Sequence, residues 1–148
     1  SVVGVSRMSH YEKLERMYLS SPTSEDYDAD ISIREGEATV TVPVQEKQFH
    51  AAGGVHGSVY FKALDDAAFF AVNSLIEDVF VLTTNFNIHL TRPVSEGEIR
   101  AEGRVVNENP RQLIGEAVAY DDDGNQVARG SGTFAKSNSE LRPEIGYE

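Results

Sequence analysis

The segment from His50 to Ser58, with the sequence HAAGGVHGS, places two histidines and a glycine-rich turn directly before a long apolar run. Such a turn at the start of a helix gathers several backbone N–H groups at the positive end of the helix dipole, where a developing oxyanion is stabilised. The apolar run carries Asp65 and Asp66. A carboxylate in such a run is costly to bury unless it has a partner, a shifted pKa or a chemical role. Oxyanion donors and a buried acid together predict a minimal hydrolytic site.

The composition is that of one globular domain. The chain has 148 residues, of which 40% are hydrophobic and 25% charged, which suffices for one core but not comfortably for two. We predict a single domain over residues 9–136, with a flexible leader at 1–8 and a flexible tail at 137–148. The sequence contains no cysteine, which excludes disulfides, thiolate metal ligands and cysteine nucleophiles.

The charge balance excludes several classes of partner. With 24 acidic and 13 basic residues the net charge is −11, so we expect neither nucleic acid nor an anionic membrane as a partner. Lys62, Asp65 and Asp66 interrupt the longest apolar stretch, which argues against a membrane span. The first residues show no basic region followed by an apolar one, so we expect a cytoplasmic location. The histidines lack zinc-motif spacing, so we expect no metal site.

Hydrophobic periodicity predicts the elements that position these residues. A short helix is expected near 10–19, with Ser9 and Glu12 forming a capping box. A polar connector follows at 20–30, and a long helix that is apolar on nearly all sides is expected at 57–75. Alternating apolar residues predict five strands, at 37–44, 79–90, 99–106, 113–120 and 126–135. We expect the last four strands to form an antiparallel meander, giving an α+β fold with the sheet wrapped around the central helix.

Three features together resemble a known family. They are His56-Gly57, an acid nine positions after that histidine, and the pattern Arg-Pro-Val-x-x-Gly at 92–97. This combination resembles the hot-dog-fold acyl-CoA thioesterases of the PaaI-like and hydroxybenzoyl-CoA branch, over roughly residues 36–136. The resemblance implies a hot-dog fold and hydrolysis of an acyl-CoA thioester to the free acid and CoA. It implies no cofactor, because coenzyme A is part of the substrate.

The resemblance also implies roles for four catalytic residues. Gly57 would polarise the thioester carbonyl through its backbone N–H, and Asp65 would act as nucleophile or as general base. Thr83 falls where related enzymes place a Ser or Thr that helps to position water. His50 stands where many relatives have Asn, which leaves the division of labour between His50 and Asp65 open.

Substrate contacts are assigned to His56, Ser58 and Arg111. Ser58 replaces a second glycine that is common after the His-Gly pair, and Arg111, at a turn into a strand, is the preferred contact for the phosphates of CoA. Structural alternatives stand beside these roles. His56 can pin the turn, and Asp66, about 100° further round the helix, is the alternative acid.

The proposed chemistry requires two chains. Gly57 and Asp65 are eight residues apart on one helix, a separation of about 12 Å at ~1.5 Å per residue. Reacting groups must lie within roughly 3–3.5 Å of each other. Two antiparallel helices related by a two-fold axis would bring Gly57 of one chain beside Asp65 of the other. We therefore expect a homodimer or a dimer of dimers.

Three other functions remain open at this stage. The first is a non-catalytic hot-dog module that binds acyl-CoA or lipid, in which His50 in place of Asn would mark a decayed site. The second is a hydratase or dehydratase on the same fold, which uses a histidine and an acid at a different spacing. The third is a purely structural oligomer.

Overall fold

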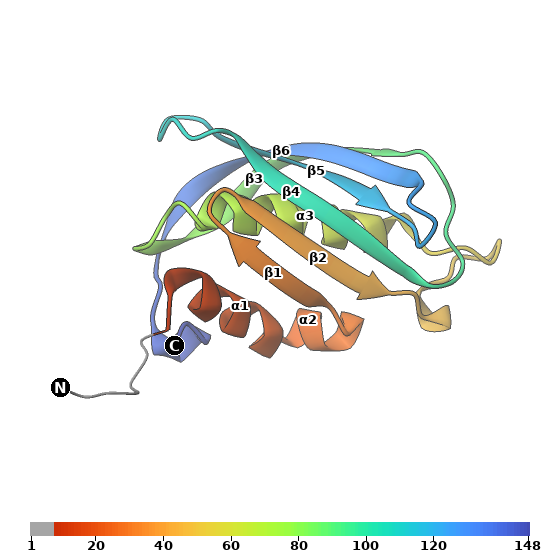
Figure 1. Ribbon diagram of the computed structural model, residues 1–148, viewed down its shortest axis with the longest axis horizontal. Coiled ribbons are helices and arrows are strands. Elements are labelled where there is room, and N and C mark those ends of the chain that lie inside the picture. The colour runs from red at the N-terminus through yellow and green to blue at the C-terminus, as the bar shows by residue number, and fades with distance from the viewer. Residues whose placement is uncertain (1–7) are drawn as a thin grey trace.

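A single antiparallel sheet curves around one long helix in the computed structural model, which describes residues 8–148 (Figure 1). Its six strands lie in the order β1-β2-β4-β5-β6-β3. Their bounds are Asp30–Arg34 (β1), Glu37–Pro43 (β2), Val79–Leu90 (β3), Glu98–Asn107 (β4), Leu113–Tyr120 (β5) and Gln126–Glu140 (β6). The predicted hot-dog architecture is confirmed. The predicted leader, apart from Met8, lies outside the described residues.

The central helix α3 (Gly57–Asn73) is buried on most of its circumference, as its sequence predicts. Eleven of its 17 residues are buried, and it packs against β2, β4 and β5. The helix backbone comes very close to the sheet at Gly103, where an added Cβ would lie 2.3 Å from the Ala67 carbonyl oxygen. Glycine at this position therefore sets the depth at which α3 sits in the sheet.

The predicted meander of the last four strands is wrong at its first step. β3 pairs with β6 and not with β4, while β4 pairs with β2 and β5. The two hairpins that the sequence does predict, β4–β5 and β5–β6, have turn residues between their strands, and Gly124 adopts the positive φ that the second turn requires. Residues 91–97 between β3 and β4 contain Pro93 and have no tight-turn pattern, so this segment crosses over and leaves β3 at the edge of the sheet.

The polar connector predicted at 20–30 contains regular structure. The predicted first helix is confirmed as α1 (His10–Ser20), with the Ser9–Glu12 capping box in place. A second helix, α2 (Pro22–Tyr27), follows it, and the five-residue strand β1 begins at the end of the segment. The sequence signal for β1 is short: only two side chains, Ile31 and Ile33, alternate inward.

The boundary predicted for the C-terminal tail is also wrong. β6 continues to Glu140, and a 3₁₀ turn, η2, covers Pro143–Ile145. The segment then returns to the start of α1, where the Tyr147 hydroxyl lies 2.7 Å from His10 Nδ1 and His10 Nε2 donates to the Asn73 carbonyl at 2.9 Å. Figure 1 shows the C-terminus beside α1.

Replacing Gly103 by Ala tests the close approach of α3 to the sheet. The new Cβ would collide with helix backbone, which cannot rotate away, so we expect a loss of about 2–4 kcal/mol in the free energy of unfolding. Gly36→Ala is the control, because that site has a positive φ of 72° but no atom within 4 Å of the added Cβ. It should cost only about 1–2 kcal/mol. Equal losses in urea titrations would contradict the packing argument.

Candidate active site

Asp65 lies on the half-buried side of α3 and is held by one hydroxyl. Thr83, on β3, donates a hydrogen bond to Asp65 Oδ1 at 2.8 Å. Burial raises the pKa of Asp65 to about 6; the nearby charge of Asp66 also raises it, while the Thr83 bond and Lys62 lower it. A carboxylate with this pKa is ionised at neutral pH and still basic enough to accept a proton from water. The structure thus brings together two of the predicted catalytic residues, Asp65 and Thr83.

Asp66, the alternative acid, is engaged in an ion pair. Its Oδ2 accepts hydrogen bonds from Lys62 Nζ at 2.5 Å and from the Tyr18 hydroxyl at 2.7 Å. The Lys62 ammonium also lies 5.0 Å from the centre of the Tyr18 ring. Burial raises the pKa of Asp66, although Lys62 opposes this shift. Asp66 therefore has the partners of a structural acid, whereas Asp65 does not.

The start of α3 presents one backbone donor. His56 is the N-cap, and its Nδ1 accepts a hydrogen bond from the Ser58 N–H at 3.0 Å. The Val59 N–H bonds to the His56 carbonyl at 3.0 Å. Among the described residues, no acceptor takes the Gly57 N–H. Gly57 thus has the donor that an oxyanion needs at the positive end of a helix. His56 caps the helix, which corresponds to the structural role that the sequence offered as the alternative to substrate contact.

His50 is fixed as a hydrogen-bond donor. Its Nδ1 accepts the Ala52 N–H at 3.1 Å, so the ring proton of the neutral form is assigned to Nε2. The ring packs over Gly54, where an added Cβ would lie 3.2 Å from Nε2. His50, Gly57, Tyr60, Arg92 and Leu90 line one cavity of about 300 Å³.

Arg92 lies in the same cavity as Gly57. Arg111, the preferred candidate, lies in the turn between β4 and β5, where its N–H donates to Asn109 Oδ1 at 3.0 Å. Figure 1 places that turn and the loop before α3 at opposite ends of the molecule. Within one chain, therefore, Arg111 is not brought together with His50, Gly57 or Asp65.

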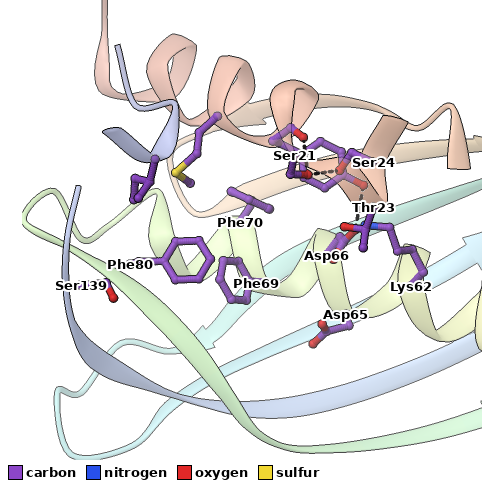
Figure 2. A pocket seen from close by; sticks show the side chains of 13 residues that line it. Ser21, Thr23, Ser24, Lys62, Asp65, Asp66, Phe69, Phe70, Phe80 and Ser139 are labelled. Carbon is purple, nitrogen blue, oxygen red and sulfur yellow. Dashed lines mark hydrogen bonds and ion pairs between the residues drawn. The ribbon is translucent and has the colours of Figure 1, made fainter. Parts of the chain in front are cut away.

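Asp65 and Gly57 line different cavities. Asp65 borders a cavity of about 400 Å³ beside α1 and α2 (Figure 2). Gly57 borders a smaller cavity at the start of α3. The helix separates the two residues by about 12 Å. Each chain thus has two half-sites.

The sequence model of the thioesterase superfamily matches residues 52–128, which is more than half of the chain. The chain belongs to the thioesterase superfamily.

Comparisons with individual proteins agree with this membership. A predicted esterase of Saccharolobus solfataricus is 31% identical over 113 residues, which cover 74% of this chain and 75% of the relative. The PaaI protein of the phenylacetic acid degradation operon of Escherichia coli superimposes with a TM-score of 0.81 at 21% identity, over 88% of this chain and 95% of that chain. A thioesterase from Haemophilus influenzae has a TM-score of 0.74 at 16% identity, over 88% of this chain and 93% of that chain.

Residues 8–148 contain no candidate for a metal site or for a membrane-spanning helix. No three or more His, Asp or Glu side chains are grouped so that they could hold a metal ion. None of the helices described for this thioesterase-family chain has both the length and the apolar character needed to cross a bilayer.

The raised pKa of Asp65 makes stability depend on pH. Between about pH 4 and 6 the folded chain holds a proton on Asp65 that the unfolded chain releases, so the stability from this proton is lost as pH rises through 6. Asp65→Asn should raise the free energy of unfolding at pH 7.5 by about 1–3 kcal/mol and change it much less at pH 4.5. Urea titrations at both pH values measure this difference.

Asp66→Asn is the matched control for the stability measurement. It removes the partner of a largely buried ammonium and should lower stability at pH 7.5. If Asp65→Asn gave the same change at both pH values, the ionised carboxylate would not be the destabilising group.

Proposed function

We propose that this protein hydrolyses acyl-CoA thioesters to the free acid and CoA, as a homodimer in which each active site draws on both chains. The observation that supports this most directly is the pair Asp65–Thr83, a buried carboxylate of raised pKa held by one hydroxyl beside a cavity. Membership of the thioesterase superfamily supports the reaction class.

The chemistry assigns each residue one task. Asp65 takes a proton from a water molecule held with the help of Thr83, and the oxygen of that water adds to the thioester carbonyl carbon. The negative charge that develops on the carbonyl oxygen is stabilised by the Gly57 N–H of the other chain and by the start of its α3. The carbon–sulfur bond then breaks, and the CoA thiolate takes up the proton from Asp65. In the alternative route, a carboxylate oxygen of Asp65 attacks the carbonyl carbon and expels the CoA thiolate. Water then hydrolyses the mixed anhydride, which releases the free acid, regenerates the Asp65 carboxylate and supplies the proton that the thiolate takes up.

The edge strand β3 supplies a way to join the two half-sites. It is 12 residues long, lies at the end of the sheet, and exposes about half of each of the Leu82 and Leu90 side chains. An unprotected edge of this kind favours pairing with a second chain. Antiparallel pairing across a two-fold axis near Phe86 would set Leu90 opposite Leu82 of the partner subunit. Because Leu90 packs against Gly57 and Thr83 bonds Asp65, such pairing brings Gly57 of one chain toward Asp65 of the other.

A cationic contact for the phosphates of CoA is assigned to Arg92. It borders the cavity that contains Gly57 and His50, so an anionic group attached to the leaving thiol would meet it there. The earlier candidate Arg111 could contribute only from another subunit. Within one chain its turn lies at the end of the molecule opposite the loop before α3.

Asp65→Asn should lower kcat at least about a hundredfold across acyl-CoAs, because the general base is lost. For the unmodified protein, kcat/KM should rise as pH rises through about 6, where Asp65 becomes ionised. Asp66→Asn should retain most of the turnover and move this midpoint to lower pH, since the charge of Asp66 raises the pKa of Asp65. Thiol release measured from pH 4.5 to 8.5 gives both results. Full activity in Asp65→Asn, with loss in Asp66→Asn, would overturn the assignment of the acid.

Gly57→Pro tests the oxyanion donor, because proline has no backbone N–H. Proline is tolerated at the first position of a helix, and His56 already has the extended conformation required before proline, with ψ of 145°. We expect a fall in kcat of about 10²–10³-fold. Gly57→Ala is the matched control, because it brings a similar Cβ against Leu90 but keeps the N–H. Equal losses in the two variants would show that crowding, not the donor, matters.

Mixing the two inactive variants tests the shared site. A heterodimer of Gly57→Pro and Asp65→Asn chains contains one site with both native groups, so co-expression should restore about a quarter of the native turnover. No recovery, in a preparation where mass spectrometry shows heterodimers, would place both groups in one chain. CoA esters that bind to the native protein without turnover would instead identify a non-catalytic binding module.

A further inference from the structure

The cavity beside Asp65 has two chemically different halves (Figure 2). One half is apolar and is walled by Phe69, Phe70 and Phe80 together with Met17 and Ile145. The three aromatic rings pack closely, with Phe69 centred 4.9 Å from Phe70 and 5.0 Å from Phe80. Asp65 lines this cavity together with the residues of both halves, and Figure 2 shows it below Asp66 and to the right of Phe69. A group attached to a carbonyl at Asp65 can therefore extend into either half.

The polar half already satisfies its own side chains. Lys62 and Tyr18 both bond to Asp66, and Ser21 Oγ donates to Ser24 Oγ at 2.8 Å. A group that entered this half would have to compete with an ion pair and its hydrogen bonds. The apolar half offers side-chain carbon and sulfur at its five large residues and one hydroxyl, that of Ser139 beside Phe80. An apolar group can enter it without breaking an ion pair.

Much of the wall of this cavity comes from residues outside the segment that the superfamily model matches. The superfamily model matches residues 52–128, whereas Met17 belongs to α1 and Ile145 to η2. The Tyr18 and Ser24 side chains, also outside the match, close the polar half. The base of the cavity therefore comes from α3, inside the matched segment, and its roof comes from elements outside that segment.

We propose that this cavity binds the acyl group of the substrate, on the same chain that supplies Asp65, and selects an uncharged apolar acyl group long enough to reach Phe80. This inference rests on the proposed function. Phe80 and Ile145 form the far wall and set the length that fits. A cavity of about 150 Å³ holds a six-membered aromatic ring. The whole cavity measures about 400 Å³, so an acyl body of about six to eight carbon atoms, as a chain or as a ring, fits within it.

Binding can be measured without catalysis by the fluorescence of a single introduced tryptophan. The chain contains no tryptophan of its own, so the signal comes from the introduced residue alone. Phe80→Trp places one fluorophore in the apolar wall by a conservative aromatic exchange. The ligands are octanamide and 3-phenylpropanamide, with acetamide as the short reference; all three are uncharged, so neither Asp65 nor Asp66 repels them. We expect a saturable fluorescence change with the two longer amides, at concentrations at least about tenfold below any effect of acetamide. Leu19→Trp is the control and should not respond. Leu19 lies on α1, is 43% exposed and is outside the cavity.

Kinetics test the selection itself. Phe80→Ala should lower kcat/KM for octanoyl-CoA by about tenfold and change it less than about threefold for acetyl-CoA, because a two-carbon group does not reach the far wall. Leu19→Ala should leave both values unchanged within about twofold. Comparing octanoyl-CoA with 3-phenylpropanoyl-CoA decides between a chain and a ring.

The outcomes separate this proposal from the proposed function. No saturable response of Phe80→Trp to either long amide would overturn the cavity assignment, whatever the enzyme hydrolyses. So would equal losses of octanoyl-CoA and acetyl-CoA hydrolysis in Phe80→Ala. A clear response of Phe80→Trp, with no thioester hydrolysed by the native protein, would support the cavity and overturn the hydrolase.

Discussion

The ion pair between Lys62 and Asp66 determines what the neighbouring carboxylate can do. Two adjacent carboxylates on a largely buried helix would oppose each other's ionisation, because burial and like charge both favour the neutral acid. Lys62 and the Tyr18 hydroxyl stabilise the charge of Asp66 directly, whereas Asp65 receives only the Thr83 hydroxyl. The same lysine also lowers the pKa of Asp65, which therefore reaches about 6 and not higher. A structural ion pair thus keeps a second, less satisfied carboxylate ready to ionise near neutral pH.

This arrangement depends on how α3 is held. Gly103 lets the helix backbone sit against β4, and α1 covers the opposite side with Tyr18 in contact with Asp66. The Lys62 ammonium, which pairs with Asp66, also lies over the Tyr18 ring. Through Tyr18, α1 therefore contacts both Asp66 and Lys62. The N-terminal helix, which lies outside the segment shared with the superfamily, consequently influences the charge state of a site built on the shared helix.

Local signals in the sequence predicted most of the fold, whereas contacts between segments far apart in the sequence were not predicted. The long helix and the two hairpins followed from periodicity and turn residues. The pairing of β3 with β6 joins residues about 40–60 positions apart in the sequence, from Leu90–Ala128 to Val79–Glu140, and has no local signature. The site divides similarly. The resemblance indicated Asp65 and Thr83, which the structure brings together. Lys62 could have been found from its spacing of four residues before Asp66, but Tyr18, 48 residues away, could not.

The structure also bears on the question that the sequence left open between His50 and Asp65. A histidine in place of asparagine could act as a second base, but its Nδ1 here accepts the Ala52 N–H within the loop before α3. The nitrogen that remains carries the proton, so the ring offers a donor, as an asparagine amide would. His50 also borders the cavity of Gly57 rather than that of Asp65. In the proposed dimer the two half-sites would be chemically complementary. One chain would contribute donors and a cation around the carbonyl oxygen and leaving group, and the other would contribute the base. Neither half contains a complete set for hydrolysis, which is the physical reason that the proposed chemistry requires both.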